Sequence, residues 1–104
     1  MEYIDKTSIQ TAIQSSTPIL IEFRSFECPA CLKAESFLNV LSKAYHKKLI
    51  VNIVNVDLDA QKMFSINKVP LCILFKQGRE ITRIEGFNNE FVFEKLLQDA
   101  LKSC

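Results

Sequence analysis

Three short runs of nearly continuous apolar residues stand out along the chain, at 19–23, 49–56 and 71–75. Each run is rich in branched residues, which is typical of central strands that are covered on both faces of a sheet. Between them lie longer stretches in which apolar residues recur at helical spacing. This alternation predicts a sheet whose inner strands are connected by helices.

One long amphipathic helix is predicted between the first two runs. Its apolar positions recur at helical spacing from Cys31 to Tyr45. The charged residues of this stretch are assigned to the opposite, solvent-facing side; they are Lys33, Glu35, Lys43 and Lys47.

Three shorter helices are expected: one near the start of the chain, one between the second and third apolar runs, and one at the end. Each begins at a residue whose side chain is able to accept a hydrogen bond from a free backbone N–H group. The candidate N-caps are Thr7 or Ser8 for the first helix, Asp59 for the second, which ends near Ser65, and Asn88 or Asn89 for the last.

A hairpin is predicted after the third apolar run. The turn 76–79 leads into an alternating strand at 81–84, which is expected to have one wet face and which Gly86 ends. With a short first strand at 3–4, the order of elements is β-α-β-α-β-α-β-β-α. The expected fold class is therefore α/β, a central mixed β-sheet flanked by helices on both faces.

Length and charge narrow the range of functions. At 104 residues with 48% hydrophobic content, the chain is expected to form a single domain over 1–104. A formal net charge of +1 creates no strong field that would recruit nucleic acid or an anionic membrane. The N-terminus shows no signal for secretion and no apolar stretch approaches the ~20 residues that span a bilayer, so a cytoplasmic location is expected.

The four cysteines form one tight pair and two scattered singles. Cys28 and Cys31 are three residues apart, whereas Cys72 lies in a predicted strand and Cys104 is the last residue. In a chain with enough aliphatic residues for a core and no secretion signal, this spacing points to chemistry and not to two structural disulfides. Cys72 is expected to be a packing thiol and Cys104 to lie at a frayed end.

The segment Cys28-Pro29-Ala30-Cys31 lies where the first apolar strand passes into the long helix. With Cys28 as the N-cap, Pro29 takes the first helical position, where its missing N–H group costs nothing. The helix dipole and free N–H groups then favour a thiolate at Cys28, the form that attacks disulfides. Cys31 lies on the apolar stripe, where a protected second thiol resolves the mixed disulfide.

Two other readings of the cysteine pair remain open. Cys-x-x-Cys is also half of many zinc sites, but the other candidate ligands, Cys72, Cys104 and His46, include no second ligand pair. The two cysteines are also small enough to pack simply as hydrophobic residues. A redox pair is favoured because Cys-x-x-Cys within a βαβ pattern is the usual context for one.

Several motifs occur in the order and spacing of the thioredoxin family, which the chain resembles from Ile19 onward. They are Ile21-Glu22-Phe23, Cys28-Pro29-Ala30-Cys31, Val56-Asp57, Val69-Pro70 and Phe75-Lys76-Gln77-Gly78. The resemblance implies the thioredoxin fold. It also implies that the Val69-Pro70 bond is cis, faces the cysteines and pairs its backbone with substrate, where an ordinary strand-start proline is the alternative.

The resemblance also assigns roles around the cysteines. Glu22 corresponds to the buried acid that moves protons at the inward cysteine, and burial would raise its pKa; the alternative is a strand-end Glu that reaches solvent. Ile53 stands where many relatives carry a lysine near this acid, and Ser36 stands where many have a helix-kinking proline, so a straighter helix is expected. The residues expected to bind substrate are Glu27, Pro29, Ala30, Val69, Pro70 and Gly86.

Two of those residues depart from the family pattern. Glu27 replaces an aromatic residue beside the nucleophile, and its charge should oppose thiolate formation at Cys28. The proline of the motif comes one place earlier, at Pro29, which leaves the N–H group of Ala30 free to donate. These effects act in opposite directions on the redox potential.

The expected function is reduction or exchange of disulfides in other proteins by a monomer that needs no cofactor or metal and that a thioredoxin reductase regenerates. A second hypothesis is a docking module whose cysteines are not used. A third is a glutathione-dependent or iron–sulfur protein, because a proline directly after the first cysteine is similar to glutaredoxins. Only Lys68 and Arg24 offer positive charge for glutathione near Val69.

Overall fold

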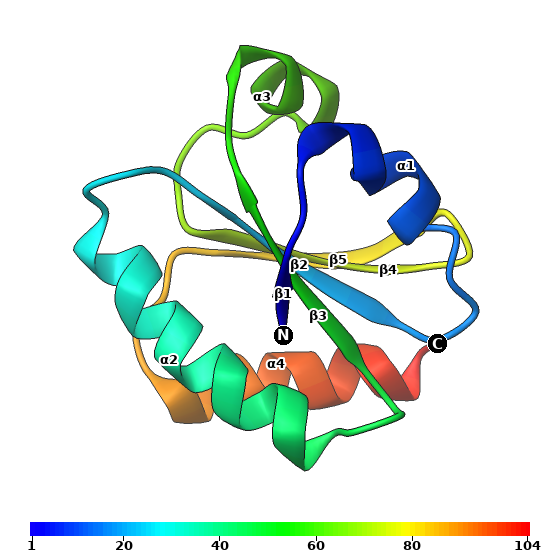
Figure 1. The fold of residues 1–104 in the computed structure, drawn as a ribbon. Helices are drawn as coiled ribbons and strands as arrows, with labels where there is room; N and C mark the ends of the chain where they lie inside the picture. The colour runs from blue at the N-terminus through cyan, green and yellow to red at the C-terminus, as the bar shows by residue number, and fades with distance from the viewer.

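The computed structural model describes residues 1–104 and contains one five-stranded mixed sheet with the strand order β1-β3-β2-β4-β5 (Figure 1). β2 pairs in parallel with β3 and antiparallel with β4, while β1 and β5 form the edges. The strands are β1 (Glu2–Tyr3), β2 (Ile19–Arg24), β3 (Ile50–Asn55), β4 (Leu71–Lys76) and β5 (Arg79–Glu85). The predicted fold class and order of elements are confirmed.

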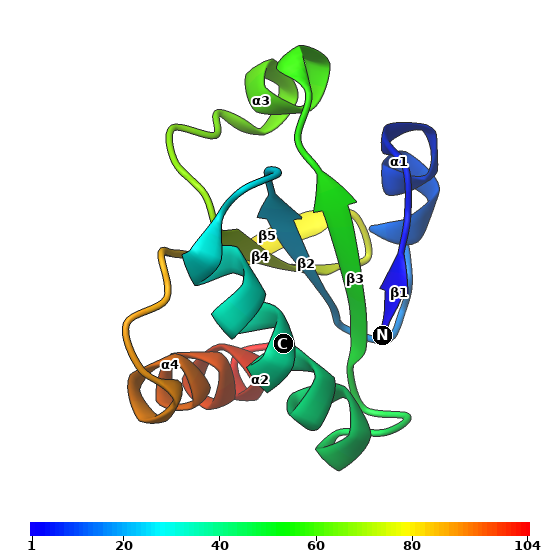
Figure 2. The same ribbon diagram turned by 60° about the vertical axis from the view of Figure 1, so that its left-hand side comes forward.

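The helices cover both faces of this sheet. Figures 1 and 2 show α2 and α4 together on one face, with α1 and α3 on the other side. A short 3₁₀ turn, η1 (Lys6–Ser8), precedes α1. The helices are α1 (Ile9–Ala12), α2 (Pro29–Ala44), α3 (Leu58–Phe64) and α4 (Glu90–Lys102). None of them is long and apolar enough to cross a membrane.

The alternation of side chains along β2 divides the core into two apolar clusters. Ile19, Ile21 and Phe23 belong to the cluster beneath α1 and α3. Leu20 belongs to the cluster that α2 and α4 cover, together with Leu38 of α2. Since successive strand residues point to opposite faces, Glu22 and Arg24 lie on the same side as Leu20, facing α2.

The helix caps partly differ from the expectation. Asn89 caps α4 as predicted, because its side chain accepts a hydrogen bond from the N–H group of Val92. Asp57, not Asp59, caps α3 by accepting from the N–H group of Ala60 at 2.9 Å. Both aspartates carry the same side chain, so the helix start decides which one serves: Asp57 has the extended backbone of a cap, whereas Asp59 lies inside the helix.

The first helical segment has a cap that the sequence did not predict. The carboxylate of Asp5 accepts from the N–H groups of Thr7 and Ser8 and caps the 3₁₀ turn η1, whereas Ser8 occupies the N-cap position of α1 as expected. Ser8 stands at the start of α1 but makes no side-chain capping bond. The helical segment begins before α1, with the 3₁₀ turn at Lys6–Ser8.

The predicted hairpin connects β4 to β5 through a two-residue turn. Gln77 and Gly78 both have positive φ, at 52° and 82°, as a type I′ turn requires. A Cβ atom at Gly78 would also come within 2.8 Å of the side-chain oxygen of Gln14. Glycine is therefore favoured there by the backbone conformation, since the flexible end of the Gln14 side chain is able to move aside.

Candidate redox site

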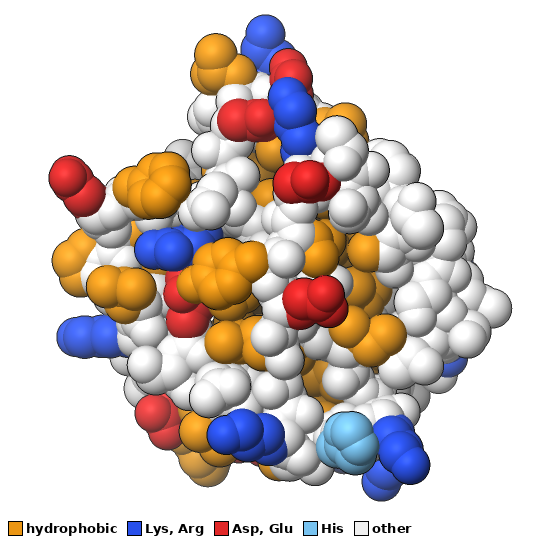
Figure 3. Space-filling view, in the orientation of Figure 1, with side chains coloured by type: hydrophobic (Ala, Val, Ile, Leu, Met, Phe, Trp, Pro, Cys, Tyr) orange, Lys and Arg blue, Asp and Glu red, His pale blue; other side chains and the backbone are white.

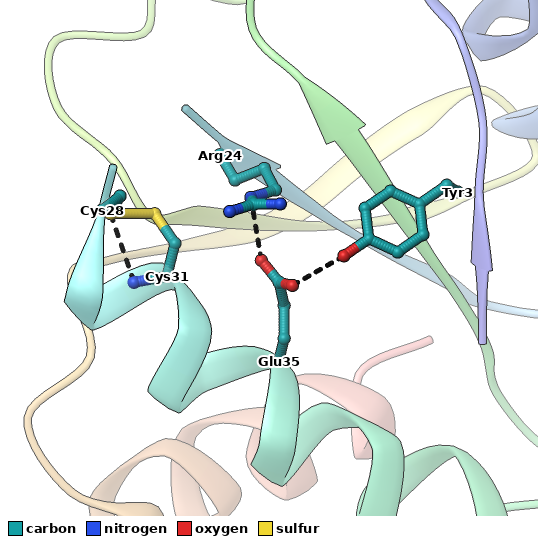
Figure 4. The surroundings of a disulfide bond; sticks show 5 residues. All are labelled: Tyr3, Arg24, Cys28, Cys31 and Glu35. Atoms are coloured by element: carbon teal, nitrogen blue, oxygen red, sulfur yellow. Dashed lines mark hydrogen bonds and ion pairs between the residues drawn. A yellow bond between two sulfur atoms is a disulfide. The ribbon is translucent and has the colours of Figure 1, made fainter. Parts of the chain in front are cut away.

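The cysteine pair lies at the junction of β2 and α2, where the sequence predicts it. Cys28 has an extended backbone and is the N-cap of α2, and Pro29 is the first helical residue. Cys28 and Cys31 form a disulfide with their Cα atoms 5.2 Å apart (Figure 4). Cys31 is fully buried, whereas Cys28 is only half-buried. Cys28 is thus the more accessible residue of the pair, and Cys31 is enclosed.

The start of α2 is built to stabilise negative charge on the Cys28 sulfur. The Cys28 sulfur accepts a hydrogen bond from the N–H group of Cys31 at 3.2 Å. Free N–H groups in the first turn and the positive end of the helix dipole both favour a thiolate there once the disulfide is reduced. Chemically, this is an arrangement for thiol–disulfide exchange at Cys28.

Glu22 is enclosed beside the site. Its side chain is 0% exposed, so the alternative that it reaches solvent is wrong, and neither carboxyl oxygen accepts a hydrogen bond. Ile53 and Cys72 flank it on the two neighbouring strands. Burial, followed by repulsion from the nearby Glu35 carboxylate, raises the pKa of Glu22 from 4.5 to about 9. In the disulfide form described here, Glu22 therefore holds a proton at neutral pH.

A cluster of three further polar residues stands next to Glu22. The Arg24 Nε lies 3.0 Å from one Glu35 carboxyl oxygen, and the Tyr3 hydroxyl donates to the other at 2.8 Å. Figure 4 shows Glu35 reaching up from α2 between Arg24 of β2 and Tyr3 of β1. The hydrogen bond to Glu35 is also the main reason why the pKa of Tyr3 is raised.

The position of Glu35 corrects the sequence prediction. Glu35 is only 7% exposed and faces the sheet, not the solvent. It follows Cys31 by four residues and precedes Leu38 by three, the spacings that place residues on one helix face. This spacing indicates that Glu35 lies on the buried face of α2, whereas the general preference of charged residues for solvent indicates the opposite.

The residues expected to bind substrate lie at three places: the β2–α2 junction, the segment before β4 and the segment after β5. Glu27 and Pro29 are exposed and Ala30 is half-buried, and Glu27 has a left-handed backbone with φ of 55°. The Val69–Pro70 bond is cis, as the resemblance implies. The N–H group of Gly86 donates to the Pro70 carbonyl at 2.8 Å, so these two loops are joined.

The remaining candidates are separate from this site. Cys72 is buried in β4, and Cys104 is exposed at the end of the chain. His46 is exposed and follows the end of α2. Across the whole chain no group of three or more His, Cys, Asp or Glu side chains is arranged to hold a metal ion. Arg24 is engaged by Glu35, which removes one of the two charges considered for glutathione.

The surface near the pair includes exposed apolar side chains. Phe26 and Leu32, on either side of the cysteines in sequence, are 78% and 57% exposed. Figure 3 shows apolar side chains over the β2–α2 loop and the start of α2, with acidic and basic side chains among them. Such a surface suits contact with a polypeptide better than with a highly charged ligand.

Comparison with known proteins yields a consistent set of relatives. The family model for thioredoxin matches residues 1–99. A thioredoxin of Alicyclobacillus acidocaldarius is 31% identical over 97 residues, which cover 91% of this chain and 92% of that protein. A thioredoxin of Mycolicibacterium smegmatis is 31% identical over 91 residues, covering 84% and 81%. A bifunctional thioredoxin reductase/thioredoxin of Mycobacterium leprae is 23% identical over 103 residues, which cover 97% of this chain and 22% of that protein.

Proposed function

Because the chain belongs to the thioredoxin family and is a protein-disulfide oxidoreductase, we propose that Cys28 is its attacking thiolate and Cys31 its resolving thiol. The observation that carries this assignment is the contrast within one disulfide. Cys28 is the half-buried N-cap of α2, whereas Cys31 is fully buried. A substrate sulfur therefore meets Cys28 first.

The proposed reaction moves two electrons from the dithiol to the substrate. The Cys28 thiolate attacks one sulfur of the substrate disulfide; that S–S bond breaks, and the leaving thiolate takes a proton from water. The Cys31 sulfur then attacks Cys28 in the mixed disulfide. A Cys28–Cys31 bond forms, the second substrate thiol is released, and the protein is oxidised while the substrate is reduced.

Glu22 is proposed as the group that accepts the Cys31 proton during the second step. Its carboxyl group is enclosed on the face of β2 that α2 covers, and burial favours the protonated form. The oxidised protein would then carry the transferred proton on Glu22. When the disulfide is reduced again, the same proton is available to Cys31.

The segment before β4 is proposed to orient the substrate. Val69 is half-buried beside the cis bond to Pro70, and Gly86 is tied to the Pro70 carbonyl. With Glu27, Pro29 and Ala30 from the β2–α2 junction, these residues would form the two sides of a docking surface. An extended substrate segment would pair with the backbone at Val69.

Regeneration of the dithiol is proposed to depend on a thioredoxin reductase. The relative from Mycobacterium leprae, which carries both names in one chain, supports this partner class. Two of the four cysteines are free and the other two form the redox pair, so there is no structural disulfide, as is usual for proteins of the reducing cytoplasm. We propose that the protein acts in the cytoplasm.

We also propose that residues 1–104 form one domain and that the protein is a monomer. A single unfolding transition would support the first proposal, and light scattering would test the second.

Reduction of insulin by dithiothreitol tests the assignment of Cys28. The wild-type protein is expected to accelerate insulin precipitation, and Cys28→Ser is expected to abolish the acceleration. Cys104→Ser is the matched control, since it makes the same change at an exposed cysteine outside the pair. Full activity in Cys28→Ser, or loss of activity in Cys104→Ser, would contradict the proposal.

A further inference from the structure

One row of residues runs across the face of the sheet on which α2 packs, starting at the exposed edge strand β1. In register order it contains Tyr3 of β1, Ile53 of β3, Glu22 of β2 and Cys72 of β4. Laterally paired residues point to the same face of a sheet, so Tyr3 and Glu22 both face α2 with the apolar Ile53 between them. Arg24 follows Glu22 by two residues and shares this face.

Helix α2 packs over this row of strand residues. Cys31 and Glu35 are one helical turn apart, and both are buried against the sheet. The redox sulfur and the Glu35 carboxylate are thus carried by the same face of one rigid element. Figure 4 shows both side chains on the sheet side of α2, with Arg24 and Tyr3 directed toward Glu35.

The charges in this enclosed space do not balance unless one carboxyl group is protonated. Glu22 and Glu35 are both buried, and Arg24 is the one cation beside them. Arg24 and Tyr3 both contact Glu35, whereas Glu22 makes no ion pair and accepts no hydrogen bond. A buried charge is tolerated only where it is paired, so Glu35 takes the negative charge.

We propose that Glu35, held by Arg24 and Tyr3, is a positioning residue that keeps a proton on Glu22, where it is available to Cys31. This inference rests on the proposed function of Glu22 and adds the residues that control it. When an external dithiol reduces the disulfide, its thiolate attacks Cys28 and the Cys28–Cys31 bond breaks. Cys31 leaves with the electron pair and takes the proton from Glu22, and the second external thiol then releases Cys28.

The groups that face Glu22 come from every element packed around it. Arg24 of β2 attracts a charge on Glu22, whereas Glu35 of α2 repels it, and the repulsion is the larger effect. Cys72 of β4 and Tyr3 of β1 are neutral near pH 7, since the pKa of each is raised. On the same face of the sheet, Cys31 is held in the disulfide, β3 contributes the apolar Ile53, and α4 buries Phe93 and Leu97.

The test is a ¹³C NMR titration of the glutamate carboxyl carbons in the oxidised protein, with the Glu22 signal assigned by its loss in Glu22→Gln. Glu35→Gln removes the repelling charge and frees Arg24 to attract Glu22. The titration midpoint of Glu22 is therefore expected to fall by about one pH unit or more. Glu80→Gln, which breaks the ion pair with Arg83 on β5, is the matched control and should leave the midpoint unchanged.

A second variant covers the case in which the unpaired Arg24 prevents Glu35→Gln from folding. The double variant Arg24→Gln/Glu35→Gln removes both charges and leaves neither unpaired. Because repulsion by Glu35 outweighs attraction by Arg24, the Glu22 midpoint is expected to fall here too, but by less. An unchanged or raised midpoint in a folded variant without Glu35 would overturn the inference.

A rate measurement tests whether the Glu22 titration affects reduction of the Cys28–Cys31 disulfide. The rate at which dithiothreitol reduces the disulfide is compared between Glu35→Gln and wild type at each pH, so that the ionisation of dithiothreitol cancels. The ratio is expected to fall by about tenfold or more as pH rises between the two Glu22 midpoints; a constant ratio would contradict the proton's role. The titration needs no turnover, so failure of the inference is distinct from failure of wild type to reduce insulin, which would refute the proposed function.

Discussion

Glu22 on β2 and Cys72 on β4 lie directly opposite each other in the antiparallel pair at the centre of the sheet. A carboxyl group and a thiol therefore share one buried strip, with Cys72 1% exposed and Glu22 fully enclosed. Burial, and then the charge that Glu22 acquires at high pH, raises the pKa of Cys72 well above its ordinary value. Cys72 is thus expected to be unreactive, because it is buried and its thiol is protonated at neutral pH.

We accordingly expect Cys72 to resist alkylation in the folded protein. After reduction, brief treatment with iodoacetamide should modify Cys28 and Cys104 but leave Cys72 unmodified, because a thiolate is needed for the reaction and burial disfavours it. Peptide mass spectrometry measures the modified fraction at each cysteine. The same treatment in denaturant should modify all four, and rapid modification of Cys72 in the native protein would contradict this account.

Replacement of the buried cysteine is expected to trap a reaction intermediate. In Cys31→Ser the Cys28 thiolate still attacks a substrate disulfide, but serine is unable to resolve the mixed disulfide. A covalent adduct that is stable without reductant should accumulate, and non-reducing electrophoresis detects it. Cys28→Ser is the control and should form no adduct, and normal turnover by Cys31→Ser would show that the two roles have been misassigned.

The buried Glu22 is expected to make stability depend on pH. Its pKa is raised from 4.5 to about 9 in the folded protein, so the folded state binds one more proton than the unfolded state between these values. The free energy of unfolding therefore decreases with rising pH in this window, by up to about 1.4 kcal/mol per pH unit for one proton. Below pH 4.5 the group is protonated in both states and contributes no slope.

Denaturant unfolding of wild type and Glu22→Gln over this pH range measures the effect. The neutral amide has no proton to lose, so the stability of the variant relative to wild type should increase steadily from about pH 4.5 to about pH 9. Taking the difference between the two proteins cancels the titration of all other groups that the substitution leaves unchanged. A difference that is constant with pH would mean that Glu22 titrates normally in the fold.

The two aspartates at the start of α3 are expected to differ in their effect on stability. Asp57→Ala removes the hydrogen bond to the N–H group of Ala60, whereas Asp59→Ala removes only an exposed contact with Lys6. Thermal unfolding should show a midpoint several degrees lower for Asp57→Ala and nearly unchanged for Asp59→Ala. Lys6 contacts both aspartates, so the comparison isolates the cap. Equal effects of the two substitutions would mean that the capping hydrogen bond of Asp57 does not stabilise the protein.

The sequence alone was sufficient for the features that depend on near neighbours in the chain. The apolar runs and helical periods predicted the order of elements because each element is defined by a local pattern of burial. Cys28 was placed at the N-cap because Pro29 fits the first helical turn. The predicted N-cap of α3, Asp59, is two residues too late, because Asp57 and Asp59 carry the same side chain. Only the backbone conformation at the helix start distinguishes them.

Only the tertiary structure decided the polar cluster beside the redox pair. Glu35 lies 11 residues from Arg24 and 32 from Tyr3 in sequence, and it meets them because α2 packs over β2 while β1 joins the far side of β3. The protonation of Glu22 depends on the same packing, because desolvation and repulsion by Glu35 arise only when three elements enclose the carboxyl group. A sequence pattern reports which face of an element is apolar, whereas the charge state of a buried group depends on what the other elements place against it.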